Sequence, residues 1–254
     1  MASVIQQGSV GTSVSDWQTF LVGRGYSYVI IDGNFGPNTT RATKSWQYSN
    51  FLRPDGVVGE KSYIVALSQG LAVHNNGFPD KPATFSAYVS NDERNRIFGK
   101  FAYVADPQPD NPEQIRVTDD WADRNLVHAS TPLLAKLKLQ KRDYIICHRL
   151  FAPRVEAFFA DIDAAGLGNR IIAWDGCYVP RFIRGSRTTL SNHAWGTAFD
   201  INADDNALGH QAASVGQRGS VVELVPLAIK HGLFWGQWYE GRKDPMHFEH
   251  AKTF

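Results

Sequence analysis

Apolar side chains recur at helical spacing in three segments of the first 70 residues. In the first two segments these positions are Val14, Trp17, Leu21, Ala42 and Trp46. Residues three or four apart lie on one face of a helix, so the spacing predicts two amphipathic helices. Asn38 or Thr39 is expected to cap the second helix, and Glu60–Leu67 is predicted to be a third, shorter helix.

An Asp-Gly turn occurs twice among these helices. The pattern Asp-Gly-x-apolar-Gly occupies Asp32–Gly36 and returns at Asp55–Gly59. Glycine accepts the positive φ that such turns need. Residues 1–73 are therefore predicted to form a small all-α domain of three helices.

The rest of the chain mixes helical and strand patterns. Residues 74–86 are rich in Asn, Pro and Gly and are predicted to be a linker. Beyond them, Pro153 is expected to begin a helix. That helix has an apolar stripe of Val155, Phe158, Phe159 and Ile162. Strand-like runs cover Tyr144–Cys147, Arg170–Trp174, Thr197–Asn202 and Met246–His250. Because the elements do not alternate regularly, residues 87–254 are predicted to be an α+β domain with a central antiparallel sheet, not a doubly wound one.

Composition and charge exclude several classes of protein. The chain has 254 residues, with 26 Lys and Arg against 25 Asp and Glu, a net charge of +1. A polyanion ligand needs an excess of cations, so nucleic acid is not an expected partner. No apolar run approaches the roughly 18 residues of a membrane-spanning helix, and the first residues lack the basic and apolar regions of a signal peptide. We therefore expect neither membrane insertion nor Sec export, and we expect Cys147 and Cys177 to be free, packed thiols.

Several common catalytic motifs are missing from the sequence. It contains no G-x-S-x-G, no G-x-x-x-x-G-K, no G-x-G-x-x-G and no H-E-x-x-H. A serine hydrolase, a P-loop NTPase and a Rossmann enzyme therefore lose most of their support.

Potential metal ligands gather in two short segments, Ser191–Asp200 and Asp244–His250. Imidazole and carboxylate are the ligands of hydrolytic zinc. If the seven residues from His193 to Asp200 were extended they would span roughly 23 Å, so the chain must fold back for both to reach one ion. Gly196, which lies between them, permits such a bend.

The second segment supplies a third ligand. Alternation along a strand places His247 and Glu249 on one face and His250 on the other, so His250 is the less favoured ligand. Asp244 lies three residues before His247, where its carboxylate can stand beside a metal without binding it. Two His and one Asp would leave a fourth position for water, as catalytic zinc requires.

Two arginines precede the first ligand segment. Hydrolysis of an amide passes through an anionic intermediate, and a guanidinium can also hold a substrate carboxylate with two bonds. Arg181 and Arg184 are therefore the candidate substrate-binding cations.

The N-terminal segment resembles the small peptidoglycan-binding domain found on many cell-wall hydrolases. The resemblance rests on Val14, Gln18 and Leu21, on DGNFGPNTTRATKSWQ at Asp32–Gln47 and on DGVVG at Asp55–Gly59. The family usually has Phe where this chain has Trp46. The alternative is a small helical bundle without a ligand.

The C-terminal segment resembles zinc peptidases that include D-alanyl-D-alanine carboxypeptidases and phage L-alanyl-D-glutamate endopeptidases. The shared patterns are S-x-H-x-x-G-x-A-x-D, from Ser191, and D-x-x-H-F-E, from Asp244. By this resemblance His193, Asp200 and His247 would bind Zn²⁺, Asp244 would be the general base, and Ser191 would help to hold substrate. The context GCYVPRFIRGS, GLFWG and MHFE is closest to the endolysin branch of this family.

Together the two resemblances imply a monomeric phage endolysin whose partner is bacterial peptidoglycan. It would be made in the host cytoplasm, without a signal peptide, and would reach the wall after release through a membrane lesion. The favoured reaction is hydrolysis of the L-alanyl-D-glutamate bond. The alternatives are a D-alanyl-D-alanine carboxypeptidase and a non-catalytic, zinc-stabilised wall-binding protein.

Overall fold

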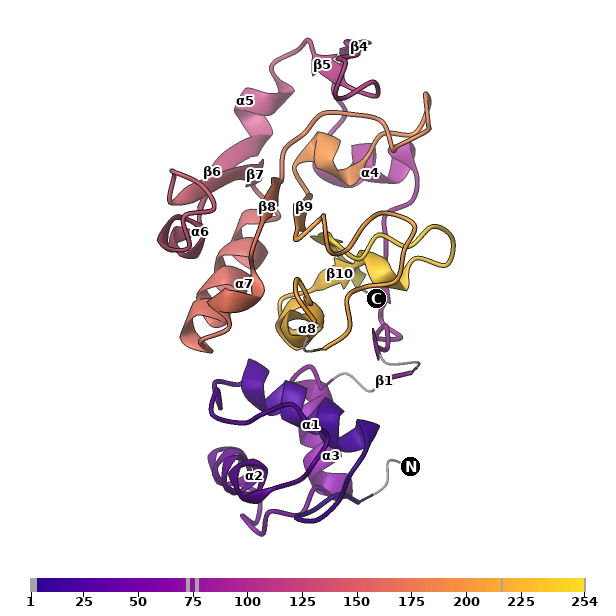
Figure 1. Ribbon diagram of the computed structural model, residues 1–254. Coiled ribbons are helices and arrows are strands. Elements are labelled where there is room, and N and C mark those ends of the chain that lie inside the picture. Colours follow the sequence, from indigo (N-terminus) through magenta and orange to yellow (C-terminus); the bar gives the residue numbers. More distant parts are fainter. Residues whose placement is uncertain (1–3, 72–73, 76–77, 216, 254) are drawn as a thin grey trace.

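The computed structural model describes residues 4–71, 74–75, 78–215 and 217–253 (Figure 1). A helical N-terminal part is followed by a larger part that contains helices and an antiparallel sheet, as the sequence predicts. The predicted boundary at residue 73 lies outside the described residues. No helix in the described part of the chain is both long and apolar enough to span a membrane.

The N-terminal part contains α1 (Thr12–Gly23), α2 (Pro37–Ser49) and α3 (Glu60–Ser68). Trp17 and Trp46 are buried between α1 and α2 and meet edge to face, with ring centroids 5.1 Å apart. The predicted cap of α2 is wrong. Gly36 precedes the helix and offers no side-chain cap. Pro37 occupies the first turn, where the amide hydrogen that proline lacks would have no partner within the helix.

The repeated Asp-Gly turns have one structural explanation. Gln18 donates to Asp32 (2.9 Å) and accepts from the amide of Gly33 (2.9 Å). Gln47 does the same at the second turn, donating to the Asp55 carboxylate (3.1 Å) and accepting from the next amide (2.9 Å). Each turn is thus fixed by a buried glutamine from the preceding helix.

The four-stranded sheet has the order β10-β11-β9-β8, and all neighbours are antiparallel. Its strands are β8 (Trp174–Gly176), β9 (Ala198–Ile201), β10 (Leu233–Trp235) and β11 (His247–His250). The predicted strand at 170–174 is wrong over most of its length. There the side-chain oxygen of Asn202 accepts from the amides of Ile172 and Ala173 (2.9 and 3.0 Å), so a side chain replaces a strand partner.

The remaining helices and strands lie outside this sheet. The α-helices are α4 (Asn91–Phe98), α5 (Trp121–Asn125), α6 (Pro132–Lys136), α7 (Ala152–Ala164) and α8 (Val225–Lys230). The 3-10 helices are η1 (Gly168–Arg170), η2 (Asn192–Trp195), η3 (Val222–Leu224) and η4 (Gly236–Trp238). The paired strands are β1 (His74–Asn75) with β2 (Phe78–Pro79), β3 (Phe85–Ser86) with β12 (Lys252–Thr253), β4 (Tyr103–Ala105) with β5 (Ile115–Val117), and β6 (Leu126–Ser130) with β7 (Tyr144–His148). Both cysteines are free and buried, as expected.

One face of the sheet is apolar and the other carries polar chemistry. Phe199 of β9 and Phe248 of β11 are cross-strand partners with stacked rings, centroids 5.6 Å apart. Both pack against Phe158, from the predicted apolar stripe of α7. The next cross-strand pair, Asp200 and His247, points to the opposite face because side chains alternate along a strand.

The N-terminal helices pack directly on the larger part of the chain. Helix α1 contacts η3 and α8, and a Cβ atom built on Gly23 would lie 3.6 Å from the Cβ of Pro226. Apolar residues of both parts belong to one buried cluster. Figure 1 shows this seam between the indigo helices and α8.

Candidate metal centre

Three side chains converge on the polar face of the sheet. His193 Nε2 lies 3.2 Å from Asp200 Oδ1 and 3.1 Å from His247 Nδ1, and the last two atoms are 2.9 Å apart. All three residues are buried. Ligand atoms that share a tetrahedral zinc at bonds of 2.0–2.2 Å stand roughly 3.3 Å apart, so the spacing fits one such ion. Within the described residues, these are the three that form a group able to hold a metal ion.

A left-handed glycine brings His193 and Asp200 together. His193 lies in η2, and Asp200 lies in β9. Gly196 connects them with φ 63° and ψ 34°, which is the fold-back expected from the sequence. A Cβ atom there would lie 3.1 Å from the amide nitrogen of His148, so glycine is also needed for close packing.

Hydrogen bonds behind the two imidazoles decide which nitrogen faces the cluster. His193 Nδ1 lies 2.8 Å from the carbonyl oxygen of Cys177, so Nδ1 carries the hydrogen and Nε2 has a free lone pair. His247 Nε2 lies 3.0 Å from Glu249 Oε2, which leaves Nδ1 bare in the same way. Two imidazole lone pairs and the Asp200 carboxylate therefore face one another. This arrangement could hold a metal ion.

Burial and mutual hydrogen bonds act in opposite directions on the pKa values of this cluster. Burial alone would lower the pKa of His247, but hydrogen bonds to Asp200 and Glu249 outweigh it and raise the pKa to about 10. Burial would raise the pKa of Asp200, but His193 and His247 hold it well below its usual range.

Asp244 stands beside the cluster without joining it. Its atom Oδ1 is buried and has no hydrogen-bond partner among the described residues. Burial is the main cause that raises its pKa, and His247 partly opposes this. Gly236 allows the loop to come this close, because a Cβ atom on it would lie 2.2 Å from the carbonyl oxygen of Asp244.

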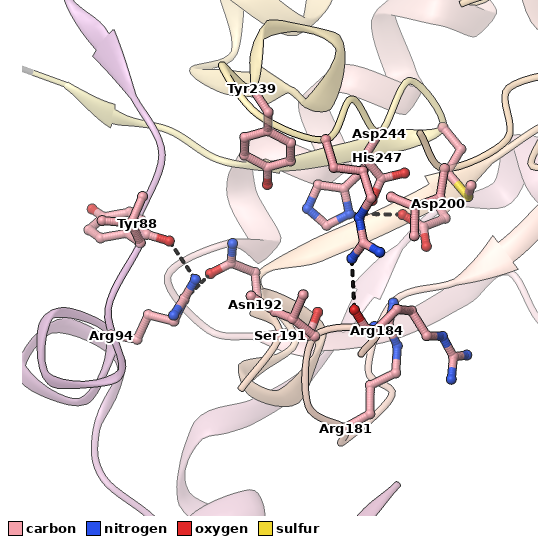
Figure 2. A pocket seen from close by; sticks show the side chains of 15 residues that line it. Tyr88, Arg94, Arg181, Arg184, Ser191, Asn192, Asp200, Tyr239, Asp244 and His247 are labelled. Carbon is pink, nitrogen blue, oxygen red and sulfur yellow. Dashed lines mark hydrogen bonds and ion pairs between the residues drawn. The ribbon is translucent and has the colours of Figure 1, made fainter. Parts of the chain in front are cut away.

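A cavity of about 560 Å³ opens over these groups (Figure 2). Asp200, Asp244 and His247 lie in its wall. The other lining residues are Tyr88, Val89, Arg94, Arg181, Ile183, Arg184, Ser191, Asn192, Leu208, Tyr239, Arg242 and Met246. Glu249 does not line the cavity, and His250 packs instead among aromatic rings, with its centroid 5.4 Å from that of Phe98.

The predicted substrate-binding residues all line this cavity but differ in their partners. Arg181 has no acidic partner within 4 Å among the residues described, and its guanidinium donates to a backbone carbonyl at 3.3 Å. Arg184 forms an ion pair with Glu113 at 2.7 Å, so it is the less available cation. Ser191 Oγ accepts from the amide of His193 (3.4 Å), so it also begins η2.

Sequence reasoning missed several residues of the cavity, among them Tyr88, Arg94, Tyr239 and Arg242. None of them belongs to a motif. Arg242 donates to the carbonyl of Arg184 at 2.8 Å and so joins two walls of the cavity. The two residues are 58 positions apart in the sequence. Such long-range proximity leaves no signal in local spacing.

Family models match both the N-terminal part and the C-terminal part of the chain. Residues 184–250 match the family model of D-alanyl-D-alanine carboxypeptidase, and residues 10–63 match that of a peptidoglycan-binding domain. The chain thus joins a peptidoglycan-binding domain to a D-alanyl-D-alanine carboxypeptidase family domain. The peptidase-family match contains Asp244 and all three residues of the cluster, whereas Arg181 lies just outside it.

Two further comparisons add little. The crystal structure of the SleB N-terminal domain is 31% identical over 27% of this chain and 93% of that chain, with a TM-score of 0.26, which is too low to support a statement about the fold. A search of curated proteins found no matching relative.

Proposed function

We propose that the protein is a zinc-dependent peptidase that hydrolyses peptidoglycan stem peptides. The observation that carries this proposal is the convergence of His193 Nε2, Asp200 Oδ1 and His247 Nδ1. Beside them stands Asp244, whose Oδ1 has no hydrogen-bond partner among the described residues, and Asp200, Asp244 and His247 line one cavity. The family match of residues 184–250 supports the same reading, as does a three-helix wall-binding domain joined to a peptidase domain built around the sheet.

The three residues would hold the ion, and Asp244 would move the proton. A zinc ion bound there would lower the pKa of its water toward 7 and polarise the substrate carbonyl. Asp244 Oδ1 would accept a proton from the attacking water and return it to the departing amine nitrogen. Its raised pKa suits both halves of this task, since a carboxyl closer to neutrality gives its proton back more readily.

The cations of the cavity favour a substrate with a carboxylate next to the scissile amide. Arg181 lacks an acidic partner among the described residues, and Arg242 contributes a second guanidinium to the same cavity. A D-glutamate joined to the chain through its side chain keeps its α-carboxylate beside the amide that is cut. A terminal D-alanine offers the same group, so a D-alanyl-D-alanine carboxypeptidase is the second candidate, favoured by the name of the matching family.

The cavity also favours the longer substrate. The cationic residues Arg181 and Arg184 line one side, whereas Tyr88 and Arg94 line another, and Figure 2 shows His247 between these two groups. Peptide could therefore extend to both sides of the reacting bond, as cleavage of L-alanyl-D-glutamate requires. The N-terminal domain would anchor the enzyme to the wall, in the role of a phage endolysin made in the host cytoplasm.

Mass spectrometry of purified peptidoglycan, digested with and without a chelator, tests the proposal. New amino groups on D-glutamate that disappear with chelator are the expected result. Release of free D-alanine would replace the endopeptidase with the carboxypeptidase. No hydrolysis by the metal-loaded protein would favour the non-catalytic wall-binding alternative.

A further inference from the structure

Glu249 is a buried carboxylate that the proposed reaction does not use. It lies on β11 two residues after His247 and is 1% exposed. Three groups meet at its atom Oε2: His247 Nε2 at 3.0 Å, the hydroxyl of Tyr239 at 2.8 Å, and the side-chain amide of Asn192. It stands behind the imidazole, on the side away from Asp200.

This carboxylate is itself held from a third element. Asn192 donates to Glu249 with its nitrogen and accepts with its oxygen from Arg94 Nε at 2.5 Å. Arg94 is 2% exposed and also donates to the backbone carbonyl of Tyr88 at 2.6 Å. A buried cation on α4 and a buried anion on β11 are thus connected through one amide, which precedes His193 in the chain.

We propose that Glu249 is a positioning residue that prepares His247 to bind the metal. By accepting the hydrogen on Nε2, it fixes the tautomer whose bare Nδ1 faces His193 and Asp200. A carboxylate hydrogen-bonded behind a ligating imidazole also makes that imidazole a stronger donor. Tyr239, Asn192 and Arg94 keep the carboxylate in place, and none of the four is required to contact a reacting atom.

The inference rests on the proposed function, because it presupposes a metal at this site, but metal binding can be measured without turnover. The experiment uses the full chain, stripped of metal, and titrates Co²⁺ as a spectroscopic probe in competition with a chelator of known affinity. Glu249→Gln should bind Co²⁺ about 10- to 100-fold more weakly, with a changed visible spectrum. Glu223→Gln is the matched control, since it alters another fully buried carboxylate, one that contacts Ser220 and Arg170 and does not line the cavity, and it should keep both affinity and spectrum.

The outcomes separate the two proposals. Equal Co²⁺ affinity and an unchanged spectrum in Glu249→Gln would overturn the positioning role while leaving the peptidase intact. Failure of the unaltered protein to bind Co²⁺ would overturn the proposed function itself. If Glu249→Gln does not fold, Tyr239→Phe takes its place. It removes one hydrogen bond to the carboxylate and should weaken Co²⁺ binding at least twofold, and an unchanged affinity there would equally overturn the inference.

Discussion

Two buried carboxylates in one cavity have pKa values that shift in opposite directions. Burial acts to raise both, but His193 and His247 overcome it at Asp200 and hold that pKa well below its usual range. At Asp244 burial prevails and the pKa rises. Two carboxyl groups whose pKa values differ in this way suit different roles. The group with the lowered pKa remains an anion that can bind a metal, and the group with the raised pKa can exchange a proton.

Removal of Asp244 tests this division at the scale of one residue. We expect Asp244→Ala to lower the rate of stem-peptide hydrolysis roughly 10²- to 10⁴-fold while the bound zinc stays at the unaltered level. Asp123→Ala, on the exposed surface of α5, is the control and should change neither. Normal hydrolysis by Asp244→Ala would refute the base assignment. Glu249 would not be an obvious substitute, since it lies behind His247 and does not line the cavity.

Local spacing predicts that His193 and Asp200 converge, because the chain between them carries the geometry. His193 and Asp200 are close in sequence, and Gly196 between them needs only one left-handed turn to join them. Local spacing could not predict that Arg184 is already paired and so less available to a substrate, because its partner Glu113 is 71 residues away. The tautomer of His193 likewise depends on a backbone carbonyl of another segment.

At the scale of elements, the site depends on how η4 and β11 approach each other. The loop between them carries Asp244, whose amide donates to the carbonyl of Gly236 at 3.1 Å. That closeness positions the carboxylate beside His247. A side chain at position 236 cannot be accommodated without moving this loop, because a Cβ atom would lie 2.2 Å from a backbone oxygen.

Gly236→Ala should therefore lower turnover while leaving the metal in place. A displacement of about 1 Å at a reacting group costs on the order of 10²-fold in rate, so we expect a loss of at least tenfold. Gly241→Ala is the matched control on the same loop, since a Cβ atom there meets nothing within 4 Å. Equal turnover by the two variants, measured on a soluble stem peptide, would show that the loop position is not critical.

The elements themselves were predictable where burial repeats with a simple period. The apolar stripe on α7 follows from such a pattern, whereas the strands β7, β9 and β11 follow from short strand-like runs of the sequence. The predicted strand at 170–174 failed because Asn202, some 30 residues away, binds those amides with its side chain. Strand propensity alone does not reveal such a competitor.

At the scale of the whole molecule, the two domains share a seam. Helix α1 lies against η3 and α8, and Gly70 is so close to Pro226 that a Cβ atom would lie 2.8 Å from its carbonyl oxygen. Domain boundaries predicted from composition do not foresee such packing, because a polar linker suggests separate modules. The two domains therefore pack on each other directly.

Deletion of residues 1–73 tests whether wall retention and peptide hydrolysis belong to different domains. We expect retention on purified walls to fall while turnover of a small soluble stem peptide persists, because none of the cavity residues comes from this segment. The truncated protein should also unfold at lower urea, since the apolar seam at Leu227 becomes exposed. Equal loss of wall retention and soluble turnover would contradict a division of labour between the domains.

Buried histidines predict how stability changes with pH. His148 is fully buried, with Nε2 3.1 Å from the carbonyl of Phe98 and Nδ1 accepting from the amide of Leu150. Burial lowers the pKa of His148 from 6.5 to about 4, and that of His250 to about 3. Between pH 6.5 and 4 the unfolded chain therefore binds protons that the folded protein does not, so the free energy of unfolding falls as pH falls.

Urea unfolding between pH 7 and pH 5 measures this effect. His148 should contribute a slope of up to about 1.4 kcal/mol per pH unit, and His148→Gln should reduce the slope by that amount. His128→Gln, on the exposed face of β6, should leave the slope unchanged. A slope that is the same in both variants would show that His148 is not the group responsible.

The most direct test of the whole picture is the metal dependence of peptidoglycan hydrolysis. Metal content and release of stem-peptide fragments would be measured together for the purified protein, for the same protein after chelation, and after zinc is returned. We expect about one zinc per chain, loss of hydrolysis on chelation and its recovery with zinc. His193→Ala should neither retain zinc nor hydrolyse the wall. Undiminished hydrolysis by the metal-free protein would contradict a metal centre built from His193, Asp200 and His247.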